Sequence, residues 1–354
     1  MKIVAVRSYL KKMALTKPYT IAYSTFSTVS LAFFEIELAN GMVGYGCGSP
    51  AGEVVGETSE QTADHLETDF VKNFVGRDIR HFQTIINESR NHFDHLPGTQ
   101  AAIDIALHDA FGKFLNISVA DFYGQKMKAL PTSITIGIKN IEDTLEEAAG
   151  FLSLGFKILK VKLGLNLEED IEKINKLYEK FSNNYIIRVD PNQGYSLSDL
   201  NKFLMATQKA KIELIEQPLP VGQELELLKV DPTYRKLLMG DESLKDPQAA
   251  LAYAISKPFG VYNIKLMKCG GISGAMEIAT IARNANINLF WGCNDESIIS
   301  ITAALHAAYC SVNTKYIDLD GSFDLAEDLV TGGFTLIDGY MHINNQPGFG
   351  VTKL

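Results

Sequence analysis

Hydrophobic and polar residues alternate in three short segments near the N-terminus, residues 2–10, 29–38 and 42–49. A period of two is typical of half-exposed strands, and Asn40-Gly41 between the last two segments is a favoured hairpin turn. Over residues 52–123 the apolar positions recur at helical spacing instead. The pattern predicts an α+β unit over residues 1–125, which shows no catalytic motif of its own.

After residue 125 the pattern becomes regular, with short apolar strands alternating with amphipathic helices. Eight segments have the character of strands: SITIGI, ILKVKL, YIIRVD, IELIEQ, LLMGDE, VYNIKL, NLFWGC and YIDLDG. They recur every 24 to 30 residues, the length of one strand, one helix and two loops. This spacing predicts a (β/α)₈ barrel over residues 126–326. A final segment, residues 327–354, contains another strand pair that we expect to return to the first unit.

Composition and charge exclude several classes of protein. The formal net charge is −9 and no basic block offsets it, which argues against a nucleic-acid or anionic-membrane surface. No apolar run approaches the roughly 18 residues that a membrane span needs, and the first ten residues read as a strand, not as a signal peptide. The four cysteines form no C-x-x-C pair. We therefore expect a protein of a reduced, cytoplasmic compartment without a nucleic-acid or membrane partner.

One polar residue stands in the C-terminal part of each predicted barrel strand. In chain order these residues are Thr135, Lys160, Asp190, Glu216, Asp241, Lys265, Cys293 and Asp318. Active sites of such barrels lie at the C-terminal ends of the strands, so these side chains should converge there. The alternative is that each is a solvated charge at the edge of a loop, but the repeated position favours a shared site.

Three consecutive strands end in carboxylates: Asp190, Glu216 and Asp241. An all-oxygen ligand set without His or Cys suits Mg²⁺ better than zinc or copper. A divalent cation would also relieve the repulsion that otherwise raises the pKa of each carboxyl group. The alternative is three separate ion pairs with lysines.

Lysines flank this triad on both sides of the barrel. Lys160 and Lys162 are two residues apart and share one face of their strand, whereas Lys265 lies across the barrel. Mutual repulsion beside a metal should lower their pKa values towards the range of a general base. A substrate between the lysines could lose a proton from one face and gain it on the other. A Schiff-base aldolase also uses a barrel lysine, but it needs no carboxylate triad.

The last predicted strand ends in a D-x-D pair, Asp318 and Asp320, whose side chains project to one face. Two carboxylates at the barrel mouth suit a cationic group. The alternative is a pair that forms the turn before Gly321.

Five motifs together resemble the muconate-lactonizing subgroup of the enolase superfamily. They are K-x-K at 160–162, D-P-N at 190–192, E-Q-P at 216–218, G-D-E-S at 240–243 and N-I-K at 263–265. The resemblance covers nearly the whole chain, with residues 1–125 as the capping domain. It implies one Mg²⁺ on the three carboxylates and an enediolate formed by removal of an α-proton. It also implies that Lys162 and Lys265 are the acid/base pair and that Lys160 helps to hold the substrate carboxylate.

The same resemblance suggests a dipeptide substrate. In dipeptide epimerases of this subgroup the D-x-D motif holds the α-ammonium group, and Thr135 and Cys293 match positions that line the pocket. Epimerases acting on Ala-Glu tend to carry an arginine in the loop that corresponds to residues 17–26, where this chain has Ser24 and only Lys17 as a cation. We therefore expect a small or apolar second residue.

The expected function is a Mg²⁺-dependent dipeptide epimerase that inverts the C-terminal residue by 1,1-proton transfer. The expected substrate is Ala-Ala, including D-Ala-D-Ala from cell-wall turnover, and the expected assembly is a homo-oligomer. Three alternatives stay open: an L-Ala-D/L-Glu epimerase, a racemase or cycloisomerase acting on an N-succinylamino acid or a lactonisable acid, and a catalytically silent binding barrel.

Overall fold

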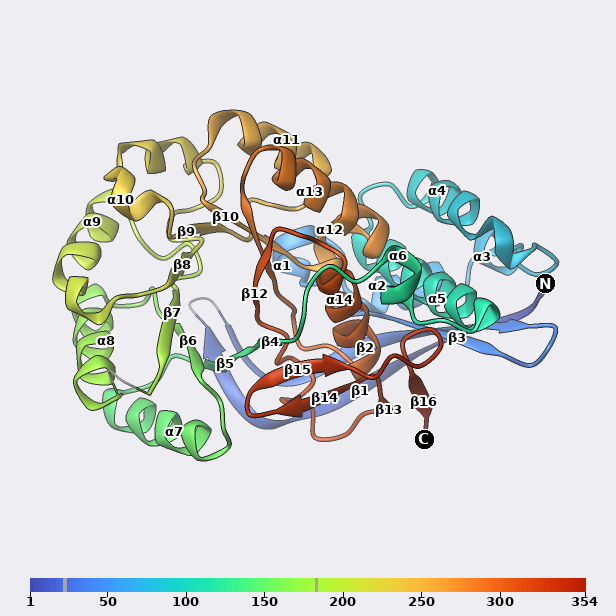
Figure 1. Ribbon diagram of the computed structural model, residues 1–354, viewed down its shortest axis with the longest axis horizontal. Helices are drawn as coiled ribbons and strands as arrows, with labels where there is room; N and C mark the ends of the chain where they lie inside the picture. Colours follow the sequence, from blue (N-terminus) through green and yellow to red (C-terminus); the bar gives the residue numbers. More distant parts are fainter. Residues whose placement is uncertain (22–23, 182–183) are drawn as a thin grey trace.

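A computed structural model describes residues 1–21, 24–181 and 184–354 of the chain. An N-terminal antiparallel sheet with its helices lies beside a ring of parallel strands and outer helices (Figure 1). The N-terminal sheet has the order β1-β2-β3, with β1 at Ile3–Ile21, β2 at Ser24–Leu38 and β3 at Val43–Gly48. All three strands predicted from the alternating pattern are present.

The β1–β2 hairpin is longer than predicted. The loop expected over residues 17–26 is strand at residues 17–21 and 24–26, with Tyr19 opposite Phe26, whereas residues 22–23 lie outside the described part of the chain. Alternation of β-branched and aromatic residues with polar ones favours this extension. Beyond the sheet, the hairpin is held by a bridge between Leu15 and Leu325 and by the carbonyl of Thr20, which accepts the amide of Ile138 at 2.8 Å. The hairpin therefore reaches over the C-terminal ends of the barrel strands.

The helices of the N-terminal part pack against this sheet. They are α1 (Gly52–Val55), α2 (Ser59–Leu66), α3 (Asp69–Lys72), η1 (Ile79–His81), α4 (Phe82–His92), α5 (Pro97–Leu115) and α6 (Val119–Tyr123). Helix α5 lies so close to β3 that a Cβ atom at Gly46 would stand 2.0 Å from the carbonyl oxygen of Ala102. Only glycine on the strand allows this approach.

All eight predicted barrel strands are present and lie in sequence order in one parallel sheet. They are β5 (Ser133–Ile136), β6 (Ile158–Lys162), β7 (Ile186–Asp190), β8 (Leu214–Glu216), β9 (Leu238–Gly240), β10 (Val261–Ile264), β11 (Asn288–Trp291) and β12 (Thr314–Ile317). The expected barrel with an N-terminal cap is confirmed.

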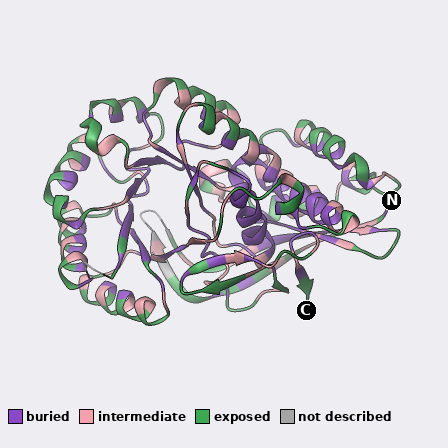
Figure 2. Ribbon diagram, in the orientation of Figure 1, coloured by how far each residue is buried: buried purple, intermediate pink, exposed green. Residues whose placement is uncertain are grey.

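Helices surround the barrel strands. They are α7 (Ile141–Ser153), α8 (Leu167–Phe181), α9 (Leu197–Ala206), η2 (Gln208–Ala210), η3 (Glu224–Lys229), α10 (Pro232–Arg235), α11 (Pro247–Ser256), α12 (Leu266–Cys269), α13 (Ile272–Asn284) and α14 (Ile298–Tyr309). Helix α14 is buried from Ile299 to Tyr309, as its colour in Figure 2 shows. It lies between the barrel and the N-terminal sheet, so it belongs to the shared core of the two parts.

Short strands complete the chain. Strand β15 (Tyr340–Ile343) lies between β14 (Phe334–Ile337) and β4 (Leu130–Pro131), and β13 (Val330–Gly332) pairs with β16 (Val351–Lys353). The last residues contact the N-terminal part, since the ammonium group of Lys353 lies 2.6 Å from Glu35. The boundaries proposed at residues 125 and 326 stay predictions. Within the described ranges, no helix is both long and apolar enough to cross a membrane.

A buried histidine in α14 predicts a pH dependence of stability. His306 accepts the amide of Ala120 at Nδ1, and burial lowers its pKa to about 3. The unfolded chain binds a proton near pH 6.5 that the folded chain does not, so the contribution of His306 to stability is complete above that pH and falls towards pH 3. This group alone should lower the free energy of unfolding by about 2–3 kcal/mol between pH 7 and 4.5. Since other groups also titrate in this range, urea denaturation should show this loss as the difference between the wild type and a variant without His306.

The variant His306→Asn keeps an acceptor for Ala120 and should lose this component of the pH dependence. The exposed His81 supplies the control, and His81→Asn should retain it. Equal pH slopes for the wild type and His306→Asn would contradict the assignment.

Candidate active site

The polar strand ends meet at one cavity of about 810 Å³ between the barrel and the hairpin. Among the predicted site residues, Thr135, Lys160, Lys162, Asp241, Lys265, Cys293, Asp318 and Asp320 line it. Lys17 and Phe26 contribute from the hairpin side. Ser24 begins β2, but its side chain lies outside the described part of the structure. Parallel strands thus bring together residues that are up to 185 positions apart in the chain.

The lysines predicted as acid and base each contact a carboxylate from a neighbouring strand end. Lys162 lies directly beside Asp190 in the β6–β7 ladder, and their Nζ and Oδ2 atoms are 2.7 Å apart. Lys265, which follows β10, lies 3.0 Å from Oδ2 of Asp241 after β9. The two lysines therefore enter the cavity from well-separated strands, β6 and β10, as the sequence predicted.

The three predicted metal ligands are almost completely buried, with exposed fractions of 0% for Asp190, 1% for Glu216 and 3% for Asp241. The ammonium group of Lys160 stands between two of them, 2.7 Å from Glu216 and 3.4 Å from Asp190. Asn263 donates to the other oxygen of Glu216 at 2.7 Å. Charges buried this deeply need such partners, because an unpaired one would carry its full desolvation cost.

Among the described residues, no three His, Cys, Asp or Glu side chains stand close enough to one another to hold a metal ion as they are. The lysine contacts explain this, since ammonium groups occupy the space between the carboxylates. The donor set nevertheless fits a hard cation. Three buried oxygens on neighbouring strand ends of the described chain lack a partner: Asn192 Oδ1, Glu242 Oε2 and Asn263 Oδ1. Between them, Oε2 of Glu216 has only the ion contact with Lys160. Unsatisfied buried oxygens are what a cation would coordinate.

The carboxyl groups do not respond equally to this environment. Burial and the neighbouring Asp190 raise the pKa of Glu216 to about 8. Burial also acts on Asp190 and Asp241, but the adjacent lysines outweigh it and lower the pKa of both groups. The expected rise in carboxyl pKa therefore holds only for Glu216, the middle member of the triad.

The lowering of the lysine pKa values was predicted for lysines beside a bound metal, and it stays a prediction. Burial opposes the charged form of Lys160 and Lys265, yet the surrounding carboxylates prevail and raise the pKa of each. The sequence argument considered repulsion between ammonium groups and gave too little weight to the carboxylates beside them.

The two members of the D-x-D pair have different surroundings. Asp318 accepts the hydroxyl of Ser133 at 2.6 Å and the ammonium of Lys160 at 2.9 Å, so both of its oxygens are engaged. Asp320 accepts the backbone amide of Thr135 at 2.8 Å. Burial and Asp318 raise the pKa of Asp320 to about 7. Both carboxylates line the cavity, as predicted from their spacing.

Several residues of the site were missed by the sequence reasoning. Lys268 is buried and donates to the carboxylate of Asp241, to the carbonyl of Asp241 at 2.6 Å and to that of Asn263 at 3.1 Å. Its spacing of three residues from Lys265 was the available signal. Glu242 follows a predicted ligand directly, lines the cavity and is 3% exposed. Its place within the G-D-E-S motif could have indicated it.

The ring of parallel strands, the covering sheet and the buried carboxylate–lysine cluster define a capped barrel enzyme of the enolase superfamily. The chain belongs to the mandelate racemase / muconate lactonizing enzyme family. Residues 3–124 match the N-terminal domain model of that family, and residues 143–353 match the enolase C-terminal domain-like model.

Several relatives resemble the chain over its full length. It is 45% identical to an L-Lys-D/L-Arg epimerase of Desulforapulum autotrophicum, with 100% of both chains covered. It is 34% identical to a hydrophobic dipeptide epimerase of Enterococcus faecalis, over 99% of this chain and 100% of the relative. The crystal structure of a dipeptide epimerase from Methylococcus capsulatus, in complex with Mg and L-Arg-D-Lys, superposes with a TM-score of 0.97 at 42% identity. That match covers 99% of this chain and 100% of the other.

These relatives confirm the expected family and the isomerase class. They do not support Ala-Ala as the substrate, because the relatives with the higher identities are named for lysine and arginine. The absence of an arginine from residues 17–26 was interpreted as a preference for substrates with a small second residue. That interpretation did not consider the acidic side chains that other parts of the chain contribute to the cavity.

The contacts of Lys268 predict a stability effect. Lys268→Met would leave the carboxylate of Asp241 and two carbonyl groups without their donor, so we expect the free energy of unfolding to fall by about 3–5 kcal/mol in urea denaturation. The matched control is Lys202→Met, which removes an exposed ion pair with Glu168 and should change stability by less than about 1 kcal/mol. Similar effects of the two substitutions would contradict a structural role for Lys268.

Proposed function

We propose that the protein is a Mg²⁺-dependent dipeptide epimerase whose substrates carry cationic side chains. The observation that supports this most directly is the charge of the cavity wall, to which nine acidic residues but only five lysines contribute. The acidic residues are Glu53, Glu60, Glu147, Asp241, Glu242, Asp295, Asp318, Asp320 and Asp324. A cavity of one sign with low-dielectric walls attracts ligands of the opposite sign.

The excess negative charge lies away from the lysine cluster. Asp324 follows β12 beyond Asp320, and no cation or hydrogen-bond donor pairs with its carboxyl group within residues 1–21, 24–181 and 184–354. Burial and the carboxylates of Asp320 and Asp295 raise the pKa of Asp324 to about 8. A lysine or arginine side chain of a substrate would supply the missing counter-charge.

The relatives support the same substrate class. An L-Lys-D/L-Arg epimerase shares 45% of its residues with this chain, and the L-Arg-D-Lys complex shows a cationic dipeptide in a protein of the same fold. Residues 17–26 contain no arginine to pair with an acidic side chain, although Lys17, which lines the cavity, is one cation in this stretch. The relatives therefore remain the stronger argument against an acidic second residue.

The proposed reaction follows from the position of the two lysines. Lys162 and Lys265 would face opposite sides of the α-carbon of the C-terminal residue, so that one removes the α-proton and the other returns a proton to the opposite face. Lys160 would hold the substrate carboxylate, and Asp318 and Asp320 the α-ammonium group. Asp190, Glu216 and Asp241 would hold Mg²⁺, which when bound supplies positive charge against the negative charge developing on the substrate.

The substrate class predicts the outcome of proton NMR in D₂O. With Mg²⁺, L-Arg-L-Lys and L-Lys-L-Arg should lose the α-proton signal of the C-terminal residue, with kcat/KM at least about a hundredfold above that for L-Ala-L-Ala. EDTA should abolish the exchange. Asp324→Asn should lower kcat/KM for the cationic dipeptides by about tenfold and leave that for L-Ala-L-Ala unchanged, because one charge partner is lost.

The control for Asp324 is Glu327→Gln, which changes an exposed acid paired with Lys11 and should not alter either substrate. Preferential turnover of L-Ala-L-Glu would overturn the cationic substrate class. Exchange with N-succinylamino acids but with no dipeptide would overturn the proposed epimerase.

The lysine pair predicts stereospecific partial reactions. Lys162→Ala and Lys265→Ala should each reduce epimerisation by at least about a thousandfold, because inversion needs both groups. Each variant should still exchange the α-proton of one stereoisomer, and the two variants should act on opposite stereoisomers. Lys229→Ala, at an exposed lysine paired with Glu226, should exchange both. Exchange of the same stereoisomer by both variants would show that the lysines do not face opposite sides.

A further inference from the structure

The barrel has a seam between its last and first strands. The ladder runs without a break from β5 to β12, but β12 and β5 share no ladder, and only the bridge between Thr132 and Ile317 joins them. Backbone pairing alone therefore fixes their relative position weakly. Side chains supply the other contacts across this gap, including the amide of Leu319, which donates to the hydroxyl of Thr132 at 2.9 Å.

Arg188 spans this seam from the inside of the barrel. It lies two residues before Asp190 on β7 and therefore on the same inner face, and it is 3% exposed. Its Nη1 atom donates to the carbonyl of Ile317 on β12 at 2.8 Å and to the hydroxyl of Ser133 on β5 at 3.0 Å. One guanidinium group thus holds both sides of the gap.

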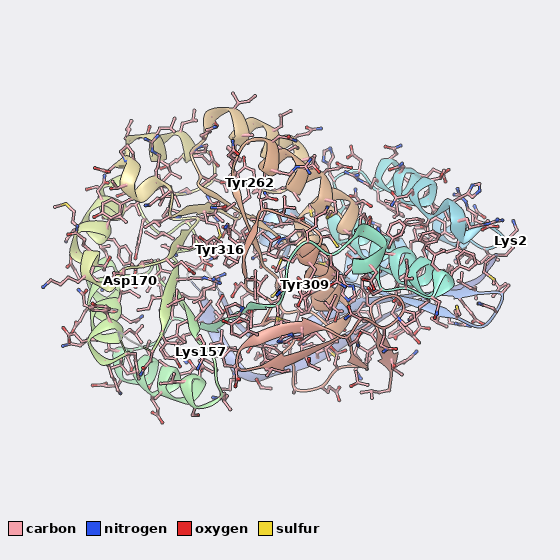
Figure 3. All side chains as sticks on the ribbon, viewed as in Figure 1. Lys2, Lys157, Asp170, Tyr262, Tyr309 and Tyr316 are labelled. Atoms are coloured by element: carbon pink, nitrogen blue, oxygen red, sulfur yellow. The ribbon has the colours of Figure 1, made fainter. Side chains whose placement is uncertain are left out.

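The surroundings keep this guanidinium in place. Its Nε atom donates to Glu213 at 2.8 Å, and its Cζ atom lies 5.2 Å from the ring centres of both Phe290 and Tyr316. Figure 3 labels Tyr316 within the ring of barrel strands, where it packs with Phe290 against an apolar cluster. Burying a guanidinium group costs desolvation free energy, which only hydrogen bonds from its planar donors can offset. Arg188 makes such bonds with Glu213, Ser133 and Ile317.

A continuous chain of hydrogen bonds leads from Arg188 to the cavity. Ser133 receives a hydrogen bond from Arg188 and donates its own proton to Oδ1 of Asp318 at 2.6 Å. The other oxygen of Asp318, Oδ2, faces the ammonium group of Lys160 at 2.9 Å. The direction of every donor in this chain is therefore fixed by the arginine, which cannot accept.

We propose that Arg188 and Ser133 are positioning residues that orient the carboxylate of Asp318 towards the α-ammonium group of a dipeptide. The inference rests on the proposed dipeptide epimerase function. With Oδ1 held by Ser133, the carboxylate cannot rotate into the seam, and Oδ2 stays directed to the cavity. The side chains that bridge the seam thus orient one end of the substrate site before the substrate binds.

The test is isothermal titration calorimetry on the Mg²⁺-supplemented full chain with two probes, L-Arg-L-Lys and its analogue without the α-amino group. Ser133→Ala should weaken binding of the dipeptide by about tenfold, because the carboxylate loses the hydrogen bond that orients it. Binding of the des-amino analogue should stay within about twofold of the wild type, and kcat for the dipeptide should change little. Ser300→Ala, which removes a buried hydroxyl bonded to the carbonyl of Cys47, should leave both affinities unchanged.

Arg188→Met should reproduce the selective loss, and Arg188→Lys should restore part of it, since one donor can still reach Ser133. Because Arg188→Met could fail to fold, Ser133→Ala is the deciding variant.

Equal weakening of both probes, or a lower melting temperature with unchanged affinities, would overturn the inference. Equal affinity of the wild-type protein for the two probes would also overturn it, because Asp318 would then hold no ammonium group. Absence of α-proton exchange in the wild-type protein would instead count against the proposed epimerase.

Discussion

The pairing of buried carboxylates with buried lysines at the C-terminal ends of the barrel strands is the constraint on which the site depends. Asp190, Glu216 and Asp241 are nearly inaccessible, and each has an ammonium group within about 3 Å or less. Charges in such a place are tolerated only in balanced sets, because any one of them alone would cost several kcal/mol to desolvate. Lys268 shows how far this balance extends, since it is not among the residues that line the cavity and it donates to Asp241 and to two carbonyl groups.

This balance explains why the rest of the molecule is so heavily packed around it. The buried helix α14 joins the N-terminal sheet to the barrel, and within the N-terminal part α5 lies in close contact with the sheet, where Gly46 meets Ala102. The hairpin is fastened to the barrel on both sides of the cavity, at Leu325 and at Ile138. Burial lowers the local dielectric around Asp190, Glu216 and Asp241, which strengthens the interactions within the cluster. In the proposed reaction the barrel would supply the reactive groups, while the hairpin and the loops after β11 and β12 would shape the wall that meets the side chains of the substrate.

Much of the fold and of the reactive cluster could be predicted from the sequence, for a physical reason. Strand spacing repeats, and parallel strands bring their ends to one edge, so Lys162 and Asp190 could be placed side by side without a structure. The extension of the hairpin could not be predicted in this way, because the described residues within 17–26 pair with one another and contact the barrel only after the chain has folded. Arg188 was equally hidden, since its contacts on β5 and β12 depend on closure of the ring.

The Ala-Ala expectation, which the relatives do not support, has a related origin. It was inferred from one missing arginine. The charge of a cavity, however, is the sum of many residues, which lie far apart in the sequence and come together only in the folded protein. Asp295 and Asp324 lie in loops after different strands, and Glu147 lies in α7, yet burial and mutual repulsion raise the pKa of Asp324 to about 8 because all three act on one small volume. Repulsion of this kind lowers the stability of the folded protein, and a cationic ligand removes it on binding. In the proposed complex, relief of the repulsion at the carboxyl group of Asp324 would add to the affinity for a cationic substrate, while the lysine-balanced carboxylates would hold Mg²⁺ during the proposed proton transfer.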